Sequence, residues 1–173
     1  MNENSIIDQL VYDPASGALT YRDIRYVVIR PETIVGFQKT IEKHSWKGAQ
    51  DALFQGGYQG GYLSAKKFKE LQNLSDSETI NFMMTMGAEI GWGHFQLIDY
   101  DFENYKLQIK VENSAFAEAY GDATEGVCHL INGVLSGLAT VLFGRNCKGS
   151  EIECLAKGDK YCVFHISDNR GFE

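Results

Sequence analysis

Apolar residues recur at helical spacing in one long segment around residue 130. The members are Val127, Leu130, Ile131, Val134, Leu135, Leu138, Val141 and Leu142. Residues three and four positions apart share one face of an α-helix, so this pattern predicts a long amphipathic helix. Asp122 or Thr124 is a suitable N-terminal cap for it, and Gly144 is a suitable C-terminal stop.

Shorter helices are predicted before this segment. Pro31 suits the first position of a helix, and its apolar face would carry Ile34, Phe37, Gln38 and Ile41. A second helix is predicted for about residues 45–71, and it contains "GGYQGGY", which suits close packing or a gate. Ser75 and Glu78 form a capping box that opens a helix through about Ile90. The stretch "NSAFAEAYG" is typical of a short helix or turn.

Alternating apolar and polar residues predict strands in three places. "HFQLIDYD" and "YKLQIKVE" are joined by "FEN" and indicate an antiparallel pair. The N-terminal part predicts short strands, the clearest at 26–29, and two last strands are predicted at 150–155 and 161–166. Helices and strands occur in blocks, which indicates an α+β fold. We expect a mainly antiparallel sheet packed with a helical layer, in which the long helix leads into a C-terminal β-hairpin.

Composition and charge limit the classes of function. The chain has 173 residues, 44% of them apolar, and a formal net charge of −7. No run of Lys or Arg exceeds two residues, which argues against binding of nucleic acid through its phosphates. We see no apolar run long enough for a membrane span and no secretory signal pattern. We therefore expect a cytoplasmic protein, in which cysteines stay reduced or bind metal.

The cysteines carry the strongest chemical signal. If "AKGD" closes a symmetric hairpin, Cys154 and Cys162 lie directly opposite, with β-carbons about 4.5–5.5 Å apart. Two thiolates at that spacing can bind one zinc ion. The candidates for the other two ligands are Glu151, Glu153, Cys128, His129, Cys147 and His165. Strand parity points Glu151 away from Cys154, so it could join only through a bulge or a strand end.

Cys128 has a separate argument as a ligand. It lies in the first turn of the predicted long helix, where unpaired N–H groups and the helix dipole favour a thiolate. Free cysteines are also among the most buried residues, so four core thiols are an alternative to a metal site. A disulfide is a further alternative. The residues alone leave these three interpretations open.

Several spaced motifs resemble the 4-vinyl-reductase domain family. That family includes a bacteriochlorophyll-pathway protein and the sensory domains of phenol- and toluene-responsive transcription activators. The motifs are "RYVVIRPETIVGF", "FQGGYQGGYLSA", "VENSAFAEAYG", "GVCHLINGVLSGLATVLFGRNC" and "SEIECLAKGDKYCVFHI". The resemblance implies a ligand-binding domain at 25–167. N-terminal strands at 1–24, which would serve dimerisation, precede this domain, and a frayed tail at 168–173 follows it.

The resemblance also implies a set of metal ligands. In the aromatic sensors of that family, zinc is held by a cysteine at a helix start, a Glu-x-x-Cys and a cysteine eight positions later. The matching residues here are Cys128, Glu151, Cys154 and Cys162. Three thiolates and one carboxylate complete a four-coordinate site, so the zinc would be structural. The histidine and tryptophan that read phenol in those sensors fall near Gly91 and Asn113, which argues against phenol itself.

A ligand pocket is expected against the long helix, whose small residues leave room. The expected lining residues are Tyr58, Tyr62, Phe82, Trp92, Phe116, Gly133 and Gly137. A largely apolar cavity with a few polar groups is the usual small-molecule site. The alternative is that these aromatic side chains simply fill the core.

We therefore expect a non-catalytic sensor or carrier domain for a hydrophobic aromatic or tetrapyrrole ligand. The resemblance also implies a homodimer and a separate signalling or biosynthetic partner, since this chain lacks the ATPase and DNA-binding domains of the activators. A vinyl reductase of a chlorophyll precursor is the alternative, but we find no G-x-G-x-x-G after a strand and no flavin motif. A protein-interaction module, like the similar subunits of a vesicle-tethering complex, is a third class.

Overall fold

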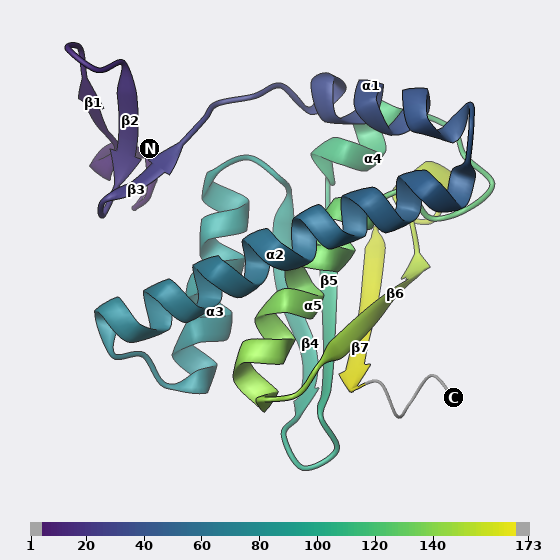
Figure 1. Ribbon diagram of the computed structural model, residues 1–173. Helices are drawn as coiled ribbons and strands as arrows, with labels where there is room; N and C mark the ends of the chain where they lie inside the picture. The colour runs from purple at the N-terminus through teal and green to yellow at the C-terminus, as the bar shows by residue number, and fades with distance from the viewer. Residues whose placement is uncertain (1–4, 169–173) are drawn as a thin grey trace.

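The computed structural model describes residues 5–168 and has the predicted α+β fold (Figure 1). Its strands are β1 (Val11–Asp13), β2 (Ala18–Tyr21), β3 (Ile24–Tyr26), β4 (His94–Asp101), β5 (Lys106–Glu112), β6 (Cys147–Glu153) and β7 (Cys162–Asp168). Its helices are α1 (Pro31–Glu42), α2 (Trp46–Gln72), α3 (Asp76–Glu89), α4 (Ala115–Tyr120) and α5 (His129–Phe143), with short 3-10 helices η1 (Ile7–Gln9) and η2 (Leu155–Lys157). Apart from Asp168, the predicted tail lies outside the described residues.

Local sequence signals set most of the helix boundaries. Pro31 is the first residue of α1, where its fixed φ and missing N–H cost nothing. The Ser45 hydroxyl caps α2 by accepting a hydrogen bond from the N–H of Gly48 (2.9 Å). The predicted capping box of Ser75 and Glu78 is confirmed at the start of α3.

The prediction for the start of the long helix is wrong. α5 begins at His129 and not after a cap at Asp122 or Thr124. The residues before it form an irregular segment that pairs with η2, where the Ala123 N–H donates to the Ala156 carbonyl (2.9 Å). Because this contact holds the segment against the β6–β7 connection, it cannot wind into the helix. The end of the helix at a left-handed glycine is confirmed.

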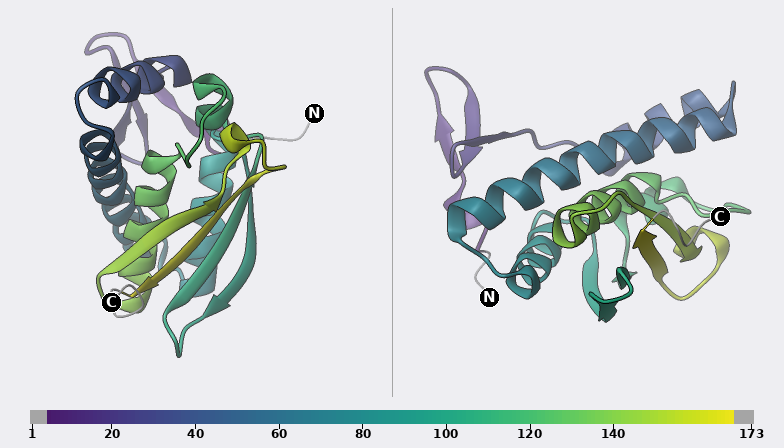
Figure 2. Two further views of the ribbon diagram at one scale, coloured as in Figure 1. Left: turned by 90° about the vertical axis from the view of Figure 1, so that its right-hand side faces the viewer. Right: turned by 60° about the horizontal axis from the view of Figure 1, so that its bottom comes forward.

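The larger sheet has the order β4-β5-β7-β6, and every neighbouring pair is antiparallel. Leu107, Ile109 and Val111 alternate along the central strand β5 and are fully buried. α5 lies between this sheet and α2 (Figure 2). No helix of the described part of the chain is long and apolar enough to cross a membrane.

Two strand predictions need correction. The last two strands span 147–153 and 162–168 rather than 150–155 and 161–166, because the chain leaves β6 before Cys154 and enters η2. The strand predicted at 26–29 is displaced to β3, which ends at Tyr26. The three residues that follow are extended and exposed, because they cross from the small β1-β2-β3 sheet to α1 (Figure 1).

Glycines on both helices allow α2 and α5 to approach closely. A β-carbon on Gly57 would lie 2.2 Å from the carbonyl oxygen of Leu130, and one on Gly133 would lie 2.1 Å from that of Phe54. No real side chain fits at such distances, so any larger residue would push the helices apart. The "GGYQGGY" stretch is therefore a helix-packing surface.

This contact gives a matched pair of substitutions. We expect Gly57→Ala to lower the free energy of unfolding by about 2–3 kcal/mol, because its methyl group would overlap a backbone carbonyl. Gly56→Ala is the control, since Gly56 is exposed on the same helix with no atom within 4 Å of an added β-carbon. It should stabilise by about 0.5–1 kcal/mol through helix propensity. Urea denaturation measures both, and equal effects would contradict the packing argument.

Candidate metal centre and ligand pocket

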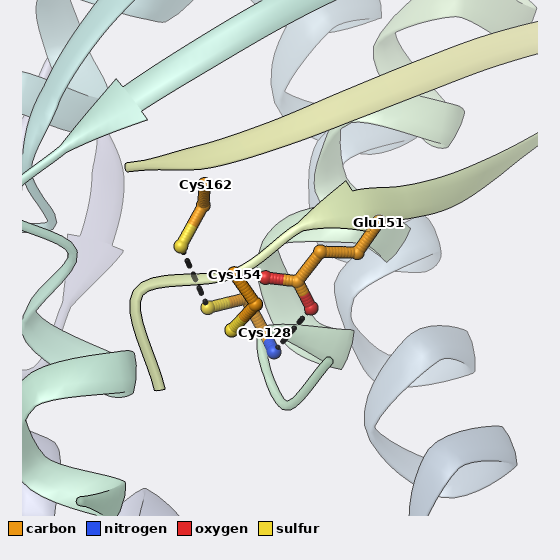
Figure 3. Close-up of side chains that lie close together, drawn as sticks. All are labelled: Cys128, Glu151, Cys154 and Cys162. Carbon is orange, nitrogen blue, oxygen red and sulfur yellow. Dashed lines mark hydrogen bonds between the residues drawn. The ribbon is translucent and has the colours of Figure 1, made fainter. Parts of the chain in front are cut away.

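Four side chains from separate parts of the chain meet where α5 begins and where β6 connects to β7 (Figure 3). They are Cys128, Glu151, Cys154 and Cys162, and one donor atom of each lies within 4.8 Å of the others. We call these four residues the Cys3Glu cluster. The structure thus brings together the residues that the family resemblance implied.

Glu151 reaches the cluster through an irregularity in β6. Strand parity predicted that it could join only through a bulge or a strand end, and the β6–β7 pairing shifts between Glu151 and Glu153. Its Oε2 atom accepts a hydrogen bond from the Cys128 N–H (2.9 Å). Its buried Oε1 atom has no hydrogen-bond partner and points towards the sulfur atoms (Figure 3). A buried oxygen without a partner, beside three thiols, fits a metal ligand.

The sulfur atoms are almost completely shielded from solvent. Cys154 and Cys162 are 0% exposed and Cys128 is 1% exposed. The Sγ atoms of Cys128 and Cys162 are 3.7 Å apart, beyond disulfide bonding distance, and all four cysteines of the chain are free. The expected direct pairing of Cys154 with Cys162 is wrong. Val111 on β5 is paired with Cys162, and Cys154 has left β6 for the residue before η2.

Two residues that support the cluster were missed in the sequence. An added β-carbon at Gly126 would lie 2.6 Å from Oε2 of Glu151, so a larger residue there would displace the carboxylate. The Asp159 carboxylate accepts a hydrogen bond from the Cys154 N–H (2.7 Å) and fixes the turn that carries this thiol. Asp159 belongs to the "AKGD" turn and is the kind of residue that bonds to nearby backbone, which was the available signal. Gly126 gave none.

The electrostatics of the cluster call for a cation. Burial, followed by the charge of Cys154, raises the pKa of Glu151 to about 8. Hydrogen bonds from the Cys128 and Cys162 thiols lower the pKa of Cys154, so one thiolate is favoured while its neighbours stay protonated. Four buried acids cannot ionise together without a compensating positive charge. A divalent ion supplies that charge, and thiolates select a soft or borderline metal.

The other candidate ligands lie apart from the cluster. Cys147 is buried at the start of β6, where its N–H donates to the Thr140 hydroxyl (3.0 Å) and its thiol to the Arg145 carbonyl (3.3 Å). Burial raises the pKa of its thiol to about 11. His165 is exposed on β7, and His129 and Glu153 are not among the residues that converge. The choice of fourth donor that the residues left open therefore falls on Glu151 in the described structure.

A separate apolar pocket of about 340 Å³ lies among the small sheet, α2, α3 and α5. Side chains that line it include Leu10, Leu19, Tyr26, Met83, Met86, Trp92, Phe95, Ile131 and Leu135. The extended residues 27–29 close one side, and Ser64 contributes a hydroxyl from α2. Most of this lining is apolar, as in small-molecule sites.

Of the seven residues expected to line a pocket, Trp92 alone lines this one. A β-carbon on Gly137 would lie 2.3 Å from the Tyr58 carbonyl, so Gly133 and Gly137 leave room for α2 and not for a ligand. Tyr58 and Tyr62 stack on each other and line surface hollows elsewhere. The remaining two pack against aromatic neighbours: Phe82 on Phe68 (ring centroids 4.8 Å apart) and Phe116 on Trp92 (5.1 Å).

Comparison with known proteins supports the family resemblance. Residues 107–168, which contain the whole Cys3Glu cluster, match the family model of the vinyl-4-reductase domain. The resemblance to the 4-vinyl-reductase family is thereby confirmed for this segment. No curated protein matches the chain in sequence.

Solved structures establish the fold over most of the chain. The phenol-responsive sensory domain of the transcription activator PoxR, with phenol, superposes with a TM-score of 0.82 at 16% identity, covering 94% of this chain and 86% of that chain. A vinyl-4-reductase family protein from Methanocaldococcus jannaschii gives 0.57 at 19% identity, covering 84% of each. Subunit 3 of a trafficking protein particle complex from Naegleria fowleri, covalently bound to palmitic acid, gives 0.56 at 12%, covering 79% and 93%.

The cluster predicts different roles for two buried cysteines. We expect Cys154→Ser to lower the bound divalent metal from about one ion per chain to near zero. The melting temperature should fall by about 10 °C or more, because metal binding contributes directly to folding. Cys147→Ser is the matched control, being equally a buried thiol but outside the cluster, and it should keep its metal. Equal metal loss in both variants, measured by plasma mass spectrometry, would contradict the assignment.

Proposed function

We propose that this chain is a non-catalytic sensor or carrier domain that binds one small apolar compound in the pocket beside α3. The observation that carries this proposal is an apolar pocket in a fold shared with a phenol-responsive sensory domain. A structural zinc ion in the Cys3Glu cluster completes the proposal. The proposal assigns sensing or transport to the pocket and stability to the metal.

Zinc is the metal that suits this donor set best. Three thiolates and a carboxylate fill its four tetrahedral positions and leave none for a substrate. An ion held there would join the irregular segment before α5 to both strands of the last hairpin, since Cys128, Glu151 and Cys162 lie on those three elements. The metal would thereby hold in place the helix that separates the two layers.

The size and lining of the pocket favour a single-ring ligand. About 340 Å³ lies at the lower end of the roughly 300–1,000 Å³ typical of ligand sites, which suits a small aromatic compound better than a tetrapyrrole. Of the polar side-chain groups on the lining, the Tyr26 hydroxyl is already directed at the Met86 sulfur (3.8 Å). The Ser64 hydroxyl is therefore the main group available to a polar substituent.

This lining predicts a preference that a titration can measure. Toluene should bind more tightly than phenol by about threefold or more, because a buried phenol hydroxyl loses hydrogen bonds to water. Ser64→Leu should weaken toluene binding by about tenfold by filling the pocket. Gln59→Leu, an exposed change on the same helix, should have no effect. Ligand-detected NMR measures all three proteins, and unchanged toluene affinity in Ser64→Leu would rule out this pocket.

We further propose a homodimer whose contact includes the extended residues 27–29, with a separate partner protein that reads the ligand state. Val27 and Val28 are 80% and 83% exposed, and Val11 and Tyr12 on the small sheet are 64% and 63% exposed. Adjacent exposed apolar side chains of this kind are typical of interaction surfaces.

The dimer has a direct test. Val28→Glu should convert a dimer to a monomer at micromolar concentration, because a buried unpaired carboxylate opposes association. Ile152→Glu, at an exposed apolar position on β6, is the control and should leave the dimer intact. Light scattering after gel filtration reports the mass. A monomeric parent protein, or dissociation by both substitutions, would refute the assigned surface.

A further inference from the structure

A second hollow of about 670 Å³ opens between α2, the start of α5 and β6. It shares no lining residue with the apolar pocket. Glu151 of the Cys3Glu cluster contributes to its wall. We call this hollow the polar cleft, because carboxylates, amides and an imidazole make up much of its lining.

Two buried polar atoms on α5 lack hydrogen-bond partners beside this cleft. His129 is 8% exposed and lines the cleft, and its Nε2 atom has no partner. Asn132 lies three residues later and also lines the cleft. Its Nδ2 donates to the Gly149 carbonyl (3.0 Å), which fixes the orientation of the amide, and its Oδ1 is left without a donor. Buried polar groups are normally paired, so both atoms call for a partner that the chain does not supply.

The charge of the lining shows which kind of partner fits. Asp51 from α2 and Glu125 from the segment before α5 add exposed carboxylates to that of Glu151. The indole N–H of Trp46 donates to Glu125 (3.1 Å) and positions that carboxylate. Lys148 is the one basic side chain among the described lining residues. Three carboxylates against one ammonium favour a positively charged ligand.

Aromatic rings form part of the α2 side of the cleft. Phe54 and Tyr58 both line it, with ring centroids 6.2 Å apart and planes tilted by 32°. The face of an aromatic ring attracts an organic ammonium group, and more strongly where water is excluded. A bare metal ion would gain nothing from these rings, whereas an amine with a short carbon chain would use both the rings and the carboxylates.

We propose that the polar cleft is a second binding site, for a small organic cation of the aliphatic diamine class. One ammonium group is held near Asp51 and Glu125, and the Asn132 oxygen accepts a hydrogen bond from it. The carbon chain lies against Phe54 and Tyr58. This site is independent of the apolar pocket, and the chain would therefore respond to two chemically unlike ligands.

Three probes of equal chain length test the charge requirement. 1,4-Diaminobutane, 1,4-butanediol and succinate are each titrated into the metal-loaded full chain at low salt and followed by amide NMR shifts. The diamine should bind saturably, with a dissociation constant below about 10 mM and with shifts at His129 and Asn132. The diol should bind at least about tenfold more weakly. Equal binding of the diol, tighter binding of succinate, or no saturable binding of the diamine would overturn the proposal.

Substitutions then locate the site. Asp51→Asn and Glu125→Gln keep the shape of each side chain and should each weaken diamine binding by about fivefold to tenfold. Asp99→Asn removes an equally exposed carboxylate on β4 and should leave the affinity unchanged. If all three substitutions weaken binding alike, the attraction comes from net charge and no site exists. Toluene binding should stay constant throughout, which separates a failure here from a failure of the apolar pocket.

Discussion

Three thiols and a carboxylate buried at one point form the constraint on which the rest of the structure depends. They lie on the segment before α5, on β6, after β6 and at the start of β7, so one ion can fix all of these parts relative to each other. Without a cation, burial keeps most of these groups protonated, and the chain retains a costly polar cluster in its core. With the cation, the same residues become a cross-link between the helical layer and the sheet.

α5 carries the consequence of that cross-link to every candidate site. Its start is held by the cluster, Ile131 and Leu135 line the apolar pocket, and His129 and Asn132 border the polar cleft. Its middle is fixed against α2 by glycine contacts that admit no sliding over a side chain. A ligand that shifts α5 therefore acts against a rigid support, which is how occupancy of a buried pocket can reach the surface.

Sequence reasoning succeeded where the signal is local. The capping box at Ser75, the proline that opens α1 and the glycine that ends α5 each act on adjacent backbone, so their types reveal their roles. It failed where a distant segment decides. Gly133 and Gly137 indicate a close approach but not what approaches, and the α2 backbone fills the space that was predicted for a ligand. The pocket depends on the small N-terminal sheet, whose position no local pattern encodes.

The coordination of the bound metal tests the account most directly. Zinc K-edge X-ray absorption on protein purified without chelator should show about three sulfur neighbours at roughly 2.3 Å and one oxygen at roughly 2.0–2.2 Å. That shell is what Cys128, Glu151, Cys154 and Cys162 would supply together. A shell of four sulfurs, a shell dominated by nitrogen, or protein that contains no zinc would contradict it.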